Sequence, residues 1–147
     1  MNPELVGRVF PPTPPYLVGR EKVREFARAV FADAPQHTDA EAARTLGYAD
    51  VVAPPTFAMV VQDLALQQLL SDPGSGIELS RLVHAEQRFR YTRPIVAGDE
   101  LVATMSVTGI RSLGGNAMIT SEAEIVDAEG AHVVTTTSVL LAGEAGA

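Results

Sequence analysis

Length, composition and charge already exclude several classes of protein. The chain has 147 residues, of which 46% are hydrophobic and 20% are charged, and its formal net charge is −7. Such a chain fits one domain with a sizeable hydrophobic core, so we expect a single domain over residues 1–147. The acidic balance argues against general binding to nucleic acid or to an anionic membrane surface.

Metal, cofactor and membrane functions are also not indicated. The chain has no cysteine, and its three histidines are far apart in sequence, so neither a disulfide framework nor a structural zinc site is expected. We expect no metal and no cofactor. Residues 1–20 lack the basic start and apolar run of a signal peptide, and no apolar stretch approaches the roughly 20 residues of a spanning helix. We therefore expect a cytoplasmic protein.

The first part of the chain is predicted to contain an extended arm and two helices. Residues 5–16 carry four prolines, which favour an edge segment or a wrapping arm. Apolar residues at helical spacing predict an amphipathic helix over 19–33, ended by Pro35. A capping box and a C-terminal glycine then predict a short helix over about 39–46.

The rest of the chain predicts a buried helix followed by strands. Residues 51–70 begin with paired prolines and then carry apolar side chains around most of the helix, which is typical of a buried helix. From Leu82 onward the hydrophobic period is two, with turns at 98–99, 114–115 and 127–130 between about four long antiparallel strands. This order predicts an α+β fold in which the sheet curls around the helix. The sheet edges left over favour dimerisation.

Six short segments occur in an order and at spacings that resemble one protein family: Val6-Gly7, Pro14-Pro15-Tyr16, Gly19-Arg20-Glu21-Lys22, Ala53-Pro54-Pro55-Thr56-Phe57, His84-Ala85-Glu86-Gln87 and Arg93-Pro94-Ile95-Val96-Ala97-Gly98-Asp99. This family is the N-terminal-type branch of the MaoC-like dehydratases, which are single hot-dog domains. Some members form one subunit of heterodimeric (3R)-hydroxyacyl-carrier-protein dehydratases of actinobacterial fatty-acid synthesis. The resemblance extends from about Val6 to Leu141.

The resemblance implies a hot-dog fold, an antiparallel sheet wrapped around a long central helix. It also implies a homodimer, or a heterodimer with a second MaoC-like hot-dog subunit, with active sites at the interface. The implied substrates are acyl thioesters of coenzyme A or of acyl carrier protein.

The resemblance points to His37 as the acid–base residue. Active relatives carry a loop Gly-Asp-x-Asn-Pro-x-His-x-Asp, whose first Asp and His form the general acid–base pair. The segment from Pro35 to Asp39 matches the second half of this loop, with His37 on the catalytic histidine. In the same register Ala32 stands where the catalytic Asp is expected, and Asp33 misses by one residue. Either a shortened loop still directs Asp33 inward, or His37 and Asp33 are solvated loop residues.

Three functions stay open on this basis. The first is an enoyl-thioester hydratase or (3R)-hydroxyacyl-thioester dehydratase that uses His37 and Asp33. The second is a non-catalytic subunit that shapes the acyl tunnel of a heterodimeric dehydratase. The third is a hot-dog acyl-CoA thioesterase, in which Asp63 near the middle of the buried helix would activate water.

Two further groups are predicted to bind substrate. The start of the central helix offers N–H groups for a thioester carbonyl, and because Pro54 and Pro55 have none, Thr56 or Phe57 would donate. Arg88 and Arg90 belong to a basic cluster, with Arg81 and Arg93, that could bind coenzyme A phosphates or an acidic carrier protein. The alternative for this cluster is a solvated strand surface.

The other two histidines are not predicted to be catalytic. Strand alternation puts His84 on the same side as Glu86, Arg88 and Arg90, so we expect it to face outward or into the dimer interface. His132 lies beside a turn and is expected to be exposed.

Overall fold

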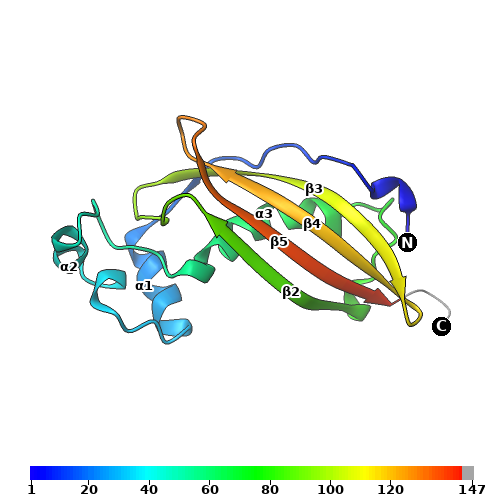
Figure 1. The fold of residues 1–147 in the computed structure, drawn as a ribbon, viewed down its shortest axis with the longest axis horizontal. Helices are drawn as coiled ribbons and strands as arrows, with labels where there is room; N and C mark the ends of the chain where they lie inside the picture. The colour runs from blue at the N-terminus through cyan, green and yellow to red at the C-terminus, as the bar shows by residue number, and fades with distance from the viewer. Residues whose placement is uncertain (144–147) are drawn as a thin grey trace.

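In the computed structural model, which describes residues 1–143, a five-stranded antiparallel sheet curls around one long helix (Figure 1). The strand order is β1-β3-β4-β5-β2. The strands are β1 (Tyr16–Leu17), β2 (Leu82–Tyr91), β3 (Glu100–Leu113), β4 (Asn116–Val126) and β5 (His132–Gly143). The helices are α1 (Arg20–Ala29), α2 (Ala40–Thr45) and α3 (Ala58–Leu70), and short 3-10 turns span Pro3–Leu5, Pro35–His37, Pro55–Phe57 and Leu79–Arg81. The expected domain runs to residue 147, and residues 144–147 lie outside the described part.

The core lies between α3 and the inner face of the sheet. Alternate residues of β3 are buried, from Leu101 to Val107, and the intervening side chains face outward. On α3, Val61, Ala65 and Leu69 are fully buried against them. The predicted α+β arrangement, with the sheet wrapped around a buried helix as in a hot-dog fold, is confirmed. None of the helices within residues 1–143 is long and apolar enough to cross a membrane.

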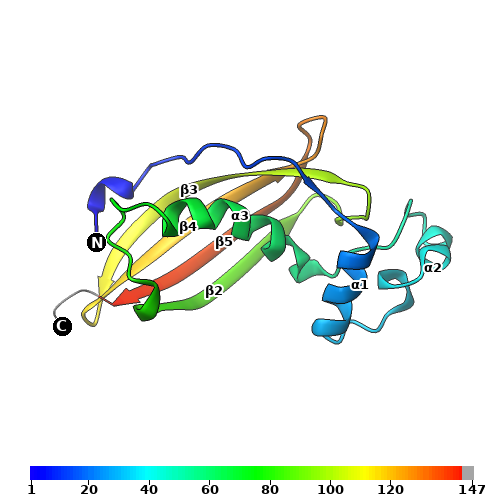
Figure 2. The same cartoon turned by 180° about the vertical axis from the view of Figure 1, so that it is seen from behind.

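The N-terminal segment covers one edge of the sheet. Gly7 and Phe10 donate backbone hydrogen bonds to Val107 and Met105 of β3 at 2.8 Å each, and Thr13 donates to Ala103 at 3.0 Å. This is the wrapping arm that the prolines predict, seen along β3 in Figure 2. At the opposite edge, β2 has no strand beside it among the described residues. The sheet therefore has one covered edge and one open edge.

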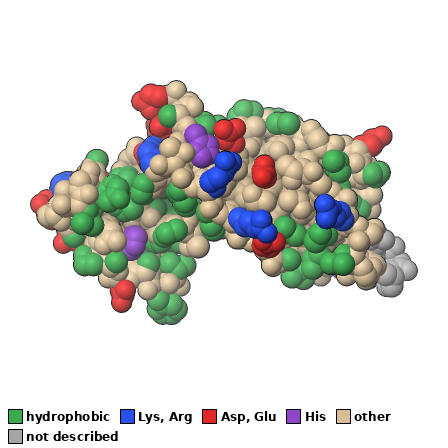
Figure 3. All heavy atoms as spheres, in the orientation of Figure 1, with side chains coloured by type: hydrophobic (Ala, Val, Ile, Leu, Met, Phe, Trp, Pro, Cys, Tyr) green, Lys and Arg blue, Asp and Glu red, His purple; other side chains and the backbone are tan. Residues whose placement is uncertain are grey.

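Helices α1 and α2 form a lobe at one end of the molecule, beyond the end of the sheet (Figures 1 and 2). Arg20 of α1 forms an ion pair with Asp50, Nη2 to Oδ2 at 2.5 Å, which ties the lobe to the segment that leads into α3. Helix α1 ends at Ala29, and Phe31, two residues later, has a φ of 57°, the left-handed value that normally favours glycine. Hydrophobic side chains gather on the surface at this end of the molecule (Figure 3).

A β-bulge in β2 overturns the expected position of His84. His84 pairs with Leu140, whereas Glu86 pairs with Val139, so Ala85 is an extra residue that reverses the alternation. His84 therefore lies on the side of Gln87, with its Nε2 3.1 Å from Gln87 Oε1, and not on the side of Glu86. The prediction that His84 shares a face with Glu86 was wrong because strict alternation assumes an unbroken ladder, although His84 is exposed.

The prediction that His132 is exposed was also wrong. The residue is half-buried, and both of its ring nitrogens have partners. Its Nδ1 lies 2.6 Å from Thr92 Oγ1, and its Nε2 lies 2.7 Å from Thr135 Oγ1. These contacts tie the turn before β5 to the end of β2.

Candidate functional site

A pocket of about 280 Å³ opens where the end of β2 meets the lobe and the start of α3. Its wall is mostly apolar and consists of Val52, Ala53, Pro55, Pro94, Tyr91, Thr92, Arg93 and His37. Two backbone bonds fix the segment before α3 in this wall: Val52 N–H donates to Gln36 at 2.9 Å, and Ala53 N–H donates to Ile95 at 2.8 Å. The pocket therefore joins three stretches of chain that are distant in sequence.

His37 reaches the pocket from the 3-10 turn Pro35–His37. Its Nδ1 lies 2.6 Å from the carbonyl oxygen of Val52. Because a carbonyl oxygen only accepts, Nδ1 carries the proton, and in the neutral ring Nε2 keeps a free lone pair. Asp39, the last residue of the matched loop, caps α2 by accepting from Glu41 N–H at 2.9 Å.

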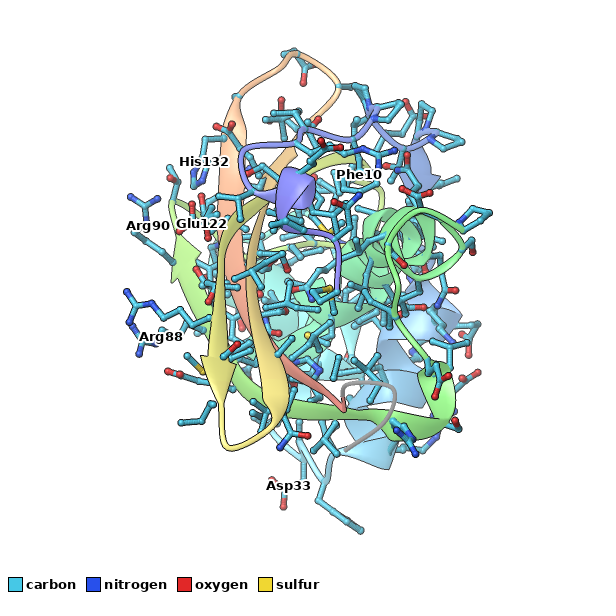
Figure 4. The ribbon with its side chains drawn as sticks, turned by 90° about the vertical axis from the view of Figure 1, so that its right-hand side faces the viewer. Phe10, Asp33, Arg88, Arg90, Glu122 and His132 are labelled. Atoms are coloured by element: carbon cyan, nitrogen blue, oxygen red, sulfur yellow. The ribbon has the colours of Figure 1, made fainter. Side chains whose placement is uncertain are left out.

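Asp33 lies outside this pocket. It borders a separate hollow of about 360 Å³ with Arg28, Phe31 and Thr38. In Figure 4 its side chain lies at the lower edge of the molecule. The backbone turns at Phe31, where Ala32 N–H returns to Ala27 at 2.8 Å, and Asp33 follows this turn on the surface. The structure does not bring Asp33 and His37 together, and no carboxylate lines the His37 pocket in the described part of the chain.

The start of α3 differs from the sequence-based expectation. Phe57 N–H donates to Pro54 at 2.9 Å, and the Phe57 ring is fully buried with its edge toward Phe26, at 5.3 Å between centroids. Thr56 is exposed and does not line the pocket. The side chain that reaches the helix start is Tyr91, whose hydroxyl donates to the carbonyl oxygen of Pro55.

Sequence reasoning did not single out Tyr91 as a site residue. The available signal was its inward position in β2, two residues from Phe89, on which its ring stacks at 6.3 Å between centroids. Burial raises the pKa of Tyr91 to about 12. The hydroxyl therefore stays protonated and remains a hydrogen-bond donor throughout the neutral range.

Arg88 and Arg90 lie on the outer face of β2, where both side chains project away from the molecule (Figure 4). The Nε atom of Arg88 contacts Glu86 Oε1 at 2.5 Å. Arg90 borders an outer hollow together with Glu122 and Glu124. This setting resembles the solvated-strand alternative, and a role for either arginine in phosphate binding stays a prediction.

Arg93 is a structural cation at the rim of the pocket. It contacts both carboxylate oxygens of Asp99, at 2.8 and 3.1 Å, and Asp127 at 3.3 Å. The hydrogen bond to Asp99 raises the pKa of Arg93. The ion pairs hold the loop after β2 against the turn before β5, so this guanidinium is already engaged.

Asp63 is the remaining predicted functional residue. Asp63 is exposed on α3 and faces Gln67, away from the residues that line the His37 pocket. Within residues 1–143, no three His, Asp or Glu side chains converge in a way that could hold a metal ion.

Comparison with known proteins identifies the family. Residues 4–136 match the family model of the FAS1-like dehydratase domain region. A solved MaoC-like dehydratase superposes on 96% of the chain with a TM-score of 0.84 and 39% sequence identity. This chain belongs to the MaoC-like dehydratase family. It spans 43% of the length of that larger MaoC-like dehydratase.

Other proteins match over nearly their whole length. The HadBC (3R-hydroxyacyl-ACP dehydratase) complex of Mycobacterium tuberculosis contains a chain that is 30% identical, with a TM-score of 0.82, over 96% of this chain and 99% of that one. A UPF0336 protein of Leifsonia xyli is 62% identical over 141 residues, which is 96% of this chain and 95% of the relative. The hot-dog fold of this MaoC-like chain is thus supported by both sequence and structure.

Proposed function

We propose that this chain is the non-catalytic, acyl-binding subunit of a two-chain hot-dog dehydratase that acts on 3-hydroxyacyl and enoyl thioesters. The observation that carries the proposal is the missing acid: His37 stands in an apolar pocket without a carboxylate, and Asp33 lies in a separate hollow. In this proposal, a MaoC-like partner supplies the acid–base pair.

The chemistry explains why the missing carboxylate matters. Reversible dehydration removes a hydroxyl at the β-carbon while a proton leaves the α-carbon, so two positioned groups share the proton transfers. His37 Nε2 can take one proton, because Nδ1 is committed to Val52. The other titratable side chains that line the described pocket are Tyr91, whose hydroxyl donates to Pro55, and Arg93, which is paired with two carboxylates. No carboxylate of residues 1–143 lines it to hold the water or the leaving hydroxyl.

The open edge of the sheet supports a second subunit. Strand β2 spans ten residues and has no neighbour on one side among the described residues. Exposed edge strands are commonly covered by another chain. The similarity to HadBC, a complex of a (3R)-hydroxyacyl-ACP dehydratase, supports a partner of the same hot-dog type. We favour such a heterodimer over a homodimer, because a homodimer would lack the acid in both halves.

The substrate class in this proposal is an acyl thioester of coenzyme A or acyl carrier protein, and the acyl chain would occupy the pocket beside His37. The mostly apolar lining fits a hydrocarbon chain. A cytoplasmic location is part of the proposal, because these thioesters are intracellular metabolites.

An assay with and without a partner tests the proposal. The purified chain is mixed with crotonyl-CoA or a longer trans-2-enoyl-CoA, and loss of the conjugated enoyl absorbance is followed. We expect no hydration by the chain alone and hydration once a MaoC-like chain with an intact Asp–His loop is added, at a rate above that of the partner alone. Equal rates for the partner with and without this chain would contradict the proposal.

A second candidate is a hydratase that works alone with His37 and a reoriented Asp33. It is favoured by the half-buried His37 and its free Nε2. Hydration by the isolated chain that disappears in His37→Ala would support it. The thioesterase alternative would release free thiol from acyl-CoA and lose this activity in Asp63→Asn, and the exposure of Asp63 gives it less support.

A further inference from the structure

The outer face of the sheet carries opposite charges in two matched rows. Each row crosses three neighbouring strands, with an arginine on β2, a threonine on β5 and a glutamate on β4. The strand pairing defines the two rows as Arg88-Thr137-Glu122 and Arg90-Thr135-Glu124. The arginine and the glutamate of one row are two strands apart, which is roughly 10 Å between their backbones. Positive charge therefore lies on one side of β5 and negative charge on the other.

The four charged side chains are exposed and only weakly engaged within the chain. Figure 4 shows Arg88 and Arg90 projecting away from this face. Arg88 contacts Glu86 at 2.5 Å, and an exposed ion pair of this kind contributes little free energy and is easily exchanged. Within residues 1–143, Arg90 and Glu124 form no ion pair. The rows are thus available to an external partner.

The balance of charge on this face decides which partner fits. Basic and acidic side chains lie close together on the face that Figure 3 shows. Arg90, Glu122 and Glu124 border one hollow, whose floor includes Thr135. A phosphate group or an acidic protein would be attracted by the arginines and repelled by the glutamates. A partner with the same two signs in mirrored order would meet opposite charges at every position.

A second copy of this chain has this mirrored order. A two-fold axis along β5, between two stacked sheets, exchanges the two sides of the sheet, so that β2 of one copy lies over β4 of the other. Arg90 then faces Glu124 of the second copy, and Arg88 faces Glu122 of the second copy. Stacked sheets lie about 10 Å apart, a gap that arginine and glutamate side chains reaching from opposite faces can close. The short threonine side chains of the two β5 strands meet on the axis.

We propose that the outer face of the sheet binds a second copy of this chain, with Arg88 and Arg90 of each copy paired with Glu122 and Glu124 of the other. The contact uses neither the open edge of β2 nor the residues that line the His37 pocket. A chain that also has a hot-dog partner at its edge would therefore belong to an assembly of four subunits. The proposal does not depend on the acyl-binding function.

Two charge reversals test this pairing. The full-length chain is studied by sedimentation velocity over a concentration series at low ionic strength, where exposed charges are least screened. Arg90→Glu sets like charges against Glu124 of the second copy, and Glu124→Arg sets like charges against Arg90. Each variant alone should associate at least about tenfold more weakly than the wild type, because both symmetric contacts become repulsive. Lys22→Glu, which makes the same charge change on the exposed side of α1, should associate like the wild type.

A mixture of the two reversed variants is the decisive measurement. Across the axis, every contact between Arg90→Glu and Glu124→Arg joins opposite charges again, so the mixture should recover the association that each variant lacks. Both variants keep a net negative charge, so a general attraction between them does not account for such a recovery. Thermal unfolding of each variant checks that it is folded.

Three results would overturn the proposal. The first is a wild-type chain that stays monomeric under these conditions. The second is association of equal strength in the wild type and in both variants, which would locate the contact on another surface, such as the edge of β2. The third is a mixture of folded variants that associates no better than either variant alone.

Discussion

The Nδ1 atom of His37 and the carbonyl oxygen of Val52 lie 2.6 Å apart, and this hydrogen bond decides which ring nitrogen is available to the pocket. It also connects the 3-10 turn of the lobe to the segment that leads into α3. One bond therefore serves both the stability of the lobe and the chemistry of the ring.

His37→Ala should lower stability without removing the activity of the two-chain enzyme. Loss of one partly buried hydrogen bond costs about 1 kcal/mol, or roughly 3–4 °C in Tm for a chain of this size. His37→Asn, whose amide can donate to Val52 from a similar position, should recover much of this loss. Thermal unfolding and the enoyl-CoA assay of the complex measure the two effects. Loss of nearly all activity in His37→Ala would instead identify His37 as an acid–base residue.

Phe31→Gly should stabilise the chain. Phe31 has a φ of 57° and a side chain that is 91% exposed, so the ring contributes little burial while its backbone is strained. Glycine adopts this conformation without strain, and we expect a gain of about 1 kcal/mol in the free energy of unfolding. Phe31→Ala removes the same ring without relieving the backbone and is the control. Urea unfolding that finds glycine no more stable than alanine would refute this explanation.

Acid should weaken the link between Arg20 and Asp50. The hydrogen bond from Arg20 lowers the pKa of Asp50 to about 2, below the value of about 3.9 for an unfolded chain. A lowered folded-state pKa contributes stability that is present above pH 4 and is lost as the pH falls toward 2. The pair is partly exposed, so its contribution should be at most about 1 kcal/mol.

Asp50→Asn should therefore reduce stability at pH 7 and flatten its pH dependence between pH 4 and 2. Asp63→Asn, which removes one exposed negative charge that faces Gln67, is the control. Denaturant unfolding at a series of pH values measures both. An unchanged slope for Asp50→Asn in this pH window would count against the assignment.

Ala85→Lys should block the partner without unfolding the chain. Ala85 is the exposed extra residue of the bulge on the open edge strand β2. Burying an unpaired ammonium group at an interface costs several kcal/mol, so the affinity for a hot-dog partner should fall by more than about tenfold. Ala131→Lys, in the exposed turn before β5, should leave affinity unchanged. Similar affinities for both variants would exclude this edge as the interface.

The sequence predicts the elements of the fold better than the site. Strands β3 to β5 follow from periodicity, because buried and exposed positions alternate regularly over many residues. Helix α3 follows from the apolar side chains that cover most of its surface. The covering of β3 by the N-terminal segment follows from its prolines. The bulge at Ala85 is a single-residue irregularity inside a regular pattern, and it moves His84 to the other face of β2 without any local sequence signal.

The candidate site depends on where loop and strand-end side chains point, and hydrophobic periodicity does not predict this. His37 was predicted as a site residue, and the structure places it in a pocket. The orientation of Asp33 depends on the turn at Phe31, a residue type that rarely adopts this conformation. Tyr91 lies 36 residues after Pro55 in the sequence, yet its hydroxyl donates a hydrogen bond to the Pro55 carbonyl oxygen at the start of the helix. Such a contact becomes visible only when the strand is placed in space.

The uneven protection of the two sheet edges has a consequence for assembly. Because the N-terminal segment covers β3 and its strand β1 has only two residues, β2 is the one long strand of the described sheet with an open side. Pairing through β2 with a similarly protected partner would use up the exposed backbone donors and acceptors of both chains at once. Edge-to-edge assembly would then end at two subunits. In addition to stabilising the fold, the proline-rich arm would in this way prevent the formation of fibres.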